Sequence, residues 1–146
     1  MENPNSNITK SSKIKLDFKD SKYATGRRKK SIAKVWVKKG SGNIHVNGLK
    51  MNDYFKRPVH QIIVTRPLEI SQVASNYDVK CSVKGGGLSG QAGAIILGIS
   101  KALIAHDENL KKNLKKDKLT TRDSRVVERK KYGHRKARRS FQFSKR

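Results

Sequence analysis

The alternation of apolar and polar residues divides the middle of the chain into strands. Residues 31–38 (SIAKVWVK) and 43–47 (NIHVN) alternate with a period of two, which is typical of strands that bury one face. Gly40 and Gly42 lie between these two segments, so the pattern predicts a hairpin. Residues 77–84 (YDVKCSVK) alternate in the same way and predict a further half-buried strand.

A long helix is predicted after that strand, because apolar residues recur there at spacings of three and four. The stripe consists of Ala92, Ile95, Ile96, Ile99, Ala102 and Leu103. Gly93 and Gly98 interrupt this helix at a cost of about 1 kcal/mol each relative to alanine. Their presence predicts that the helix backbone lies close to the sheet or to RNA.

Shorter helices are predicted elsewhere from local signals. One is expected around residues 49–55, and one at 107–118, where two acids open the segment and lysines close it. The run between Pro58 and Pro67 fits either a helix or a strand, and we favour a helix. Thr120 and Asp123 have the spacing of a capping box, which predicts a last helix reaching about Tyr132.

Charge changes this picture more than any other property of the composition. The 146 residues include 35 Lys and Arg against 11 Asp and Glu, a formal charge of +24. Such an excess directs a protein toward nucleic acid or an anionic membrane. We expect no membrane partner, because no stretch approaches the roughly 20 apolar residues of a span. Apolar residues gather in the middle, which predicts a disordered extension at 1–22, a globular domain at 23–118 and a basic tail at 119–146.

The last eighteen residues are the most basic part of the chain. They contain nine Lys or Arg and no Asp or Glu. Neighbouring cations about 7 Å apart repel each other by about 0.6 kcal/mol in water, so we expect this segment to stay open until a polyanion neutralises it. Tyr132, Phe141 and Phe143 supply rings that can stack on bases or lie on sugars.

Two further segments are candidates for binding phosphate. Residues 25–30 (TGRRKK) place four consecutive cations before the strand at 31–38, and residues 85–90 (GGGLSG) join a strand to a helix. The glycines match the spacing of a dinucleotide-binding turn, but the residues after Asp107 (ENLKKNLKKDK) do not form the strand that such a fold requires. A helix N-terminus that receives an RNA phosphate is one reading, and a tight turn without a ligand is the other.

The sequence gives little support to catalysis, and we expect neither a metal nor a cofactor. The four histidines do not have the spacing of a metal-binding pair. Cys81 is the only cysteine and lies in an alternating run, which favours a buried side chain over a reactive thiol. Asp117 and Asp123 are better explained as helix-start or surface charges than as ligands of a nuclease metal.

Three contiguous blocks resemble the family of the ninth protein of the bacterial-type small ribosomal subunit. They are residues 23–37 (YATGRRKKSIAKVWV), residues 83–103 (VKGGGLSGQAGAIILGISKAL) and residues 119–146. The resemblance implies a two-layer α/β (α+β) domain with a mixed sheet and helices on one face, as in a domain of the fifth small-subunit protein. It also implies a structural protein without catalytic residues or a small-molecule substrate, which binds ribosomal RNA in the head of the subunit beside other ribosomal proteins.

The resemblance and the charge pattern together give a set of expected contacts. The tip of the tail, Ser144, Lys145 and Arg146, is expected to reach the tRNA in the P site. Contacts with ribosomal RNA are expected from Arg27, Arg28, Lys29, Lys30, Lys84, Gly86, Gly87, Ser89, Gln91, Arg122, Arg125, Arg129, Lys130, Lys131, Arg135, Lys136, Arg138 and Arg139. We expect a cytoplasmic ribosome, with a mitochondrial ribosome as the alternative. A free nucleic-acid-compacting protein and a small nuclease are the competing functions.

Overall fold

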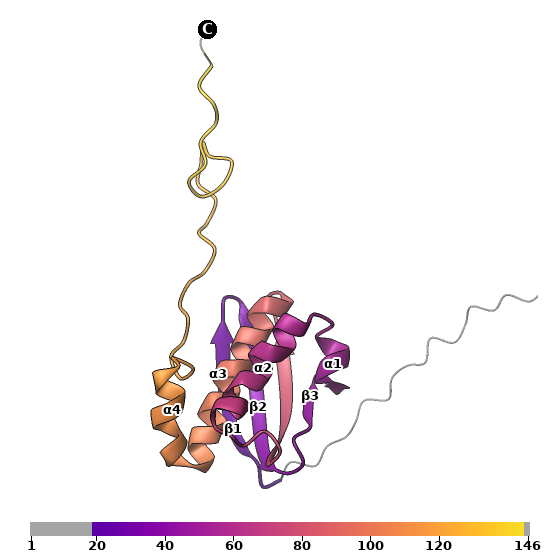
Figure 1. The fold of residues 1–146 in the computed structure, drawn as a ribbon. Helices are drawn as coiled ribbons and strands as arrows, with labels where there is room; N and C mark the ends of the chain where they lie inside the picture. The colour runs from indigo at the N-terminus through magenta and orange to yellow at the C-terminus, as the bar shows by residue number, and fades with distance from the viewer. Residues whose placement is uncertain (1–18, 145–146) are drawn as a thin grey trace, which may run out of the picture.

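A mixed five-stranded sheet with helices on one face forms the body of the protein (Figure 1). The computed structural model describes residues 19–144, so most of the predicted extension at 1–22 lies outside the described residues. The strands occur in the order β1-β2-β5-β3-β4. Their bounds are β1 Lys22–Arg28, β2 Ser31–Lys39, β3 Ile44–Val46, β4 Leu49–Lys50 and β5 Tyr77–Lys84. This architecture confirms the predicted two-layer α+β fold.

The helices differ more from the sequence prediction than the long strands do. They are α1 Met51–Tyr54, α2 Pro58–Ile70, α3 Leu88–His106 and α4 Lys111–Lys116, with a 3-10 turn at Glu108–Leu110 before α4. Helix α3 is the predicted long helix. The run between the two prolines is helical as favoured, and α2 continues through Pro67, which is buried. The segment predicted as a helix at 49–55 is divided between β4 and α1.

The core lies between the sheet and α3, as expected from the period of two in the strands and the spacing of three and four residues in the helix. Every second residue of β2 and β5 faces the helices, and the α3 stripe meets these side chains. Cys81 belongs to this buried face, in agreement with the prediction, and burial raises the pKa of its thiol. The fully buried members of the core include Ala33, Val35, Val37, Val79, Ile95, Ile99 and Leu103.

Glycines allow α3 to lie unusually close to strands β1 and β2. A Cβ atom added to Gly98 would lie 2.5 Å from Cγ2 of Val35, and one added to Gly26 would lie 2.6 Å from the backbone nitrogen of Gly98. Neither position has room for a side chain, because the opposing atoms are backbone or a fully buried valine. The predicted close approach of the α3 backbone to the sheet is therefore confirmed.

Helix α3 corrects one expectation about the apolar segments. Its 19 residues have a mean hydropathy of 1.5 and satisfy the length and composition of a membrane span, so the statement that no stretch approaches a span was wrong. Of the span-length window in α3, 61% is buried inside the protein. The apolar character of α3 is explained by its position between the sheet and α2, where most of its surface contacts protein.

The first strand was not predicted. Residues 22–28 were divided between the extension and a cluster of cations, yet they form β1 along the edge of the sheet, antiparallel to β2. The helix-facing side of β1 lacks large apolar residues because Ala24 and Gly26 face α3, where only small residues fit. The usual signal of alternating large apolar residues was therefore absent.

The predicted hairpin between the segments at 31–38 and 43–47 is also wrong. Strand β5 lies between them: it pairs antiparallel with β2 and parallel with β3. The carboxylate of Asp78 accepts hydrogen bonds from the backbone N–H groups of Ser41 and Asn43, at 3.0 and 2.8 Å. These bonds hold the loop at 40–43 across the start of β5, so the chain passes over this strand before it forms β3.

Candidate nucleic-acid interface

The structure brings the predicted basic cluster and the glycine turn together at one end of the sheet. Lys29 and Lys30 form the turn between β1 and β2, and both are exposed. Beside them, the hydroxyl of Ser31 donates a hydrogen bond to the carbonyl oxygen of Gly85 at 2.9 Å. A Cβ atom added to Gly85, which has φ = +75°, would lie 2.6 Å from the carbonyl oxygen of Lys30. We call residues 29–30 and 84–89 the loop-end surface.

The N-terminus of α3 contributes unpaired backbone donors to the loop-end surface. Gly87 precedes the helix, and no side chain within residues 19–144 caps the first turn. Such a turn offers free N–H groups and a partial positive charge to an anion. Gly86, Gly87 and Ser89 are exposed, and so is Lys84 at the end of β5. The arrangement can hold a phosphate group between the helix end and the lysine side chains.

Gln91 has a different position from the other predicted contacts of this loop. Its side-chain oxygen accepts a hydrogen bond from the hydroxyl of Tyr54 at 2.7 Å, and its side-chain nitrogen donates to Gly85 at 3.2 Å. Gln91 is half-buried and joins α1 to the glycine turn. In the structure its side chain stabilises the glycine turn of the loop-end surface through the hydrogen bond to Gly85.

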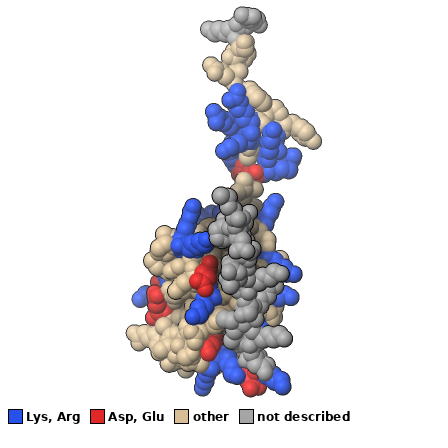
Figure 2. All heavy atoms as spheres, turned by 90° about the vertical axis from the view of Figure 1, so that its right-hand side faces the viewer, with Lys and Arg blue, Asp and Glu red and all other residues tan. Residues whose placement is uncertain are grey.

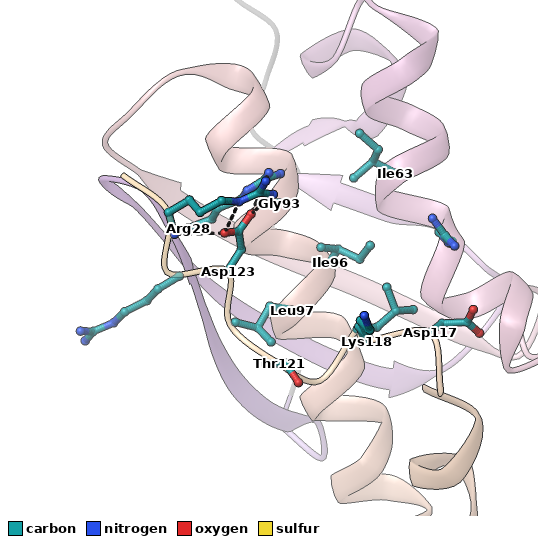
Figure 3. Close-up of a pocket in the computed structure, with 13 residues that line it drawn as sticks. Arg28, Ile63, Gly93, Ile96, Leu97, Asp117, Lys118, Thr121 and Asp123 are labelled. Carbon is teal, nitrogen blue, oxygen red and sulfur yellow. Dashed lines mark hydrogen bonds and ion pairs between the residues drawn. The ribbon is translucent and has the colours of Figure 1, made fainter. Parts of the chain in front are cut away.

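A cluster of charged side chains fixes the start of the tail against β1. The guanidinium of Arg28 donates to the carboxylate of Asp123 at 3.1 Å, and the side chain of Arg125 donates to the same carboxylate at 2.9 and 3.0 Å (Figure 3). These hydrogen bonds, that of Arg125 above all, hold the pKa of Asp123 well below its ordinary value. Arg28 and Arg125, both predicted to contact RNA, are thus partners of Asp123.

The same carboxylate explains why the predicted last helix does not form. Asp123 accepts a hydrogen bond from the backbone N–H of Arg125 at 3.0 Å, which makes a local turn in place of a helix cap. Residues 122–131 have no regular secondary structure. Val126 and Val127 are 61% and 89% exposed, so a helix here would have no apolar face to bury.

A pocket of about 410 Å³ opens beside this cluster, between α2, α3 and the start of the tail (Figure 3). Ile63, Ile96 and Leu97 give it an apolar wall, and the cations around it outnumber its two carboxylates. The Nε atom of Arg28 is buried and has no hydrogen-bond partner among the described residues. These features suit an anionic group with an apolar part. The cations that line the pocket are Arg27, Arg28, Arg66, Lys118 and Arg125.

Arg66 and Lys118 were missed as candidate contacts by the sequence analysis. Arg66 belongs to α2 and Lys118 follows α4, about fifty residues away, and only the fold brings them to one pocket. Lys118 has φ = +57°, in the left-handed region, where the chain turns from α4 into the tail. No local sequence pattern connects these two side chains.

Beyond Asp123 the tail extends away from the body (Figure 1), and Lys and Arg side chains crowd its middle part (Figure 2). Phe143 and Tyr132 are 86% and 93% exposed. Among the predicted tRNA contacts, Ser144 is exposed, while Lys145 and Arg146 lie outside the described residues. The predicted RNA contacts of the tail that are exposed are Arg122, Arg125, Arg129, Lys130, Lys131, Arg135, Lys136, Arg138 and Arg139.

The tail contains one local loop that the sequence analysis did not predict. Arg138 donates two hydrogen bonds to the carboxylate of Glu128, at 2.8 and 2.9 Å, and lowers the pKa of this acid. Within the loop, the backbone N–H of Arg135 donates to the carbonyl oxygen of Arg139 at 2.8 Å. Glu128 is the last acid before the nine cations, and that position is the signal from which this pairing could have been expected.

Comparison with known protein families gives a match over most of the chain. The model of a family described as ribosomal protein S9/S16 matches residues 26–146. The match begins inside β1 and includes the loop-end surface, the pocket and the whole tail.

Proposed function

The chain belongs to the ribosomal protein S9 family and is therefore a structural ribosomal protein that binds ribosomal RNA, and we propose that it docks on the head of the small subunit. The predicted family resemblance is confirmed by the match. Membership of this family makes other ribosomal proteins its neighbours and places it on the ribosome, as a structural protein and not an enzyme. We propose a cytoplasmic ribosome.

In this proposal the body, residues 23–118, and the tail, residues 119–146, engage RNA in different ways. The loop-end surface receives a phosphate from the folded RNA, with N–H donors of α3 that are held in place before binding. The tail follows a path between RNA segments, where its arginines donate paired hydrogen bonds to phosphates. The observation that carries the proposal is the separation of the cation-rich tail from the body.

We further propose that the tip of the tail contacts the tRNA in the P site. Residues 124–144 contain no helix, and a chain of this length spans up to roughly 70 Å when fully extended. Ser144 is exposed at the far end of the described tail. Arginine and lysine at the last two positions supply a fork and a point charge for the phosphates of an anticodon stem.

The tail is tested by the salt dependence of RNA binding. The affinity for a fragment of small-subunit RNA is measured against salt concentration for the full chain and for a chain cut after Glu128. Removal of nine cations should reduce the log-log slope by roughly 6, at about 0.7 for each neutralised phosphate. A full chain with the order of residues 129–146 shuffled is the control for charge alone. An unchanged slope after the cut would show that the tail does not bind RNA.

The tRNA contact needs a separate test with assembled subunits. Small subunits reconstituted with a chain that ends at Phe143 should sediment normally, yet release P-site tRNA faster than subunits with the full chain. Neutralising Lys145 and Arg146 to glutamine is the matched variant that keeps the length of the tail. If both altered subunits retain tRNA as well as the intact subunit does, the tip has no role at this site.

A further inference from the structure

The face of the sheet opposite the helices carries side chains that the proposed function has not used. Side chains at paired positions lie side by side on this open face, because residues directly across from each other in a sheet point the same way. Tyr23 of β1 pairs with Trp36 of β2, which pairs with Lys80 of β5. Two residues further along β2 lies Lys34, and beyond it Ile32 pairs with Lys84. We define the open face by Tyr23, Ile32, Lys34, Trp36, Lys80 and Lys84.

Aromatic and aliphatic groups on the open face are exposed to a degree that folding does not explain. Tyr23 and Trp36 form a tilted pair with ring centroids 5.4 Å apart. Tyr23 is 49% exposed and Ile32 is 43% exposed. The helices cover the other face of the sheet (Figure 1), and four residues of β2 on that covered face are fully buried or nearly so: Ser31, Ala33, Val35 and Val37. The ring of Tyr23 thus remains available for contact with a ligand.

Cations surround this aromatic pair. The ammonium group of Lys80 lies 6.0 Å from the ring centroid of Trp36, at the distance of a cation–π contact. Lys34 and Lys84 follow on the same face, at steps of about 7 Å along the strands. Asp78 is the only acid in β1, β2 and β5, and its carboxylate is occupied by backbone N–H groups of the loop at 40–43. The open face therefore combines rings with positive charge.

We propose that the open face is a second RNA-binding surface, which binds unpaired nucleotides by stacking a base on Tyr23 and Trp36. The phosphates between that base and the glycine turn would contact Lys34 and Lys84, which follow the aromatic pair in that direction. The proposal rests on the proposed function, which gives ribosomal RNA as the ligand. It adds that the RNA bound at this face is unpaired. Aromatic rings on the face of a sheet suit bases that are splayed out of a helix, whereas paired bases cannot stack on them.

Two observations favour RNA over a protein partner on this face. Lysine is depleted in the cores of protein interfaces, yet three lysines belong to the open face. The face also ends at Lys84, which directly precedes the glycine turn, so it continues into the loop-end surface. A single RNA strand can therefore pass from one surface to the other.

The single tryptophan of the chain gives a direct test, because fluorescence from Trp36 reports only on the open face. The full-length protein is titrated with single-stranded oligouridylate and, separately, with inorganic polyphosphate of equal charge. Stacking predicts that oligouridylate quenches the Trp36 signal and that polyphosphate, which has no bases, does not. Equal effects of both polyanions, or no quenching while labelled oligouridylate binds, would overturn the proposal and leave the proposed function intact.

Variants give a second readout that does not depend on the tryptophan signal. Trp36→Leu should weaken binding of labelled oligouridylate by about 5-fold to 150-fold, the range found for loss of one stacked base. Lys34→Gln should weaken it more than Lys101→Gln, which removes an equal charge from an exposed position on α3. Circular dichroism shows whether each variant is folded. If Trp36→Leu does not fold, Tyr23→Leu replaces it as the variant that removes a stacking ring.

The outcomes separate the two proposals. If Trp36→Leu leaves RNA affinity unchanged and lowers incorporation into subunits, the open face binds a protein and our inference is wrong. If the intact protein binds no RNA at all, the proposed function fails as well.

Discussion

Replacement of Gly98 by alanine tests the close approach of α3 to the sheet. Alanine is favoured over glycine in a helix by about 1 kcal/mol. Here, however, the new Cβ atom would lie 2.5 Å from Cγ2 of Val35, which is fully buried. Overpacking of this kind costs about 1 to 3 kcal/mol, so we expect Gly98→Ala to leave the free energy of unfolding unchanged or lower it by up to about 2 kcal/mol.

The matched experiment repeats the substitution without the opposing methyl groups. Val35→Ala alone should destabilise the protein by about 2 kcal/mol or more, because it leaves a cavity. In that background the nearest remaining atom is Cβ of residue 35, at 3.2 Å, which needs only a small shift, and Gly98→Ala should raise the free energy of unfolding by up to about 1 kcal/mol.

A double-mutant cycle measured by urea denaturation gives the coupling between the two sites. We expect Gly98→Ala to be about 1 to 3 kcal/mol more favourable in the Val35→Ala protein than in the original chain. If Gly98→Ala stabilises both proteins equally, the two positions do not touch. The reasoning about small residues on β1 and α3 would then be refuted.

Three further predictions concern the tail and the core. Because the folded pKa of Asp123 is depressed, its contact with Arg28 should be complete above about pH 4, the ordinary range of the carboxyl group, and should weaken only as the pH falls further. The NMR signal of the Arg28 side chain checks this, and a transition between pH 5 and 7 would contradict it. Glu128→Gln should release Arg138 for contact with RNA. The slope of log affinity against log salt concentration should then steepen by up to about 0.7, and a shallower slope would count against the pairing. Cys81, buried with a raised pKa, should react with a thiol reagent only as fast as the protein unfolds, and rapid labelling of the native protein would show that it is accessible.

The sequence predicted those elements whose two faces differ in character. Strand β5 alternates between buried residues such as Val79 and half-exposed ones such as Lys80, so its pattern is visible in isolation. Strand β1 has the same geometry, but its helix-facing residues, Ala24 and Gly26, are small because α3 is close. That cause lies about seventy residues away and leaves no local trace.

Contacts between distant segments also limited how much of the candidate site could be predicted from the sequence. The cations at 29–30 and the glycine turn were each identified from local patterns, whereas their proximity depends on the pairing of Ile32 with Lys84. Likewise, Asp123 was interpreted as a helix cap, because its partner Arg28 is 95 residues away in the sequence. Local propensity favoured a helix here, whereas Asp123 makes a local turn with the backbone of Arg125 and a long-range ion pair with Arg28.

The attachment of the tail at Asp123 has a consequence for the order of assembly. One end of the tail is held at a fixed point of the body, so docking of the body places the remaining tail within a small volume around its RNA path. Within that volume the effective concentration of the tail is in the millimolar range for a short tether. A tail that would bind RNA only weakly on its own can then occupy its path almost fully. Its individual contacts can exchange while the whole protein remains bound.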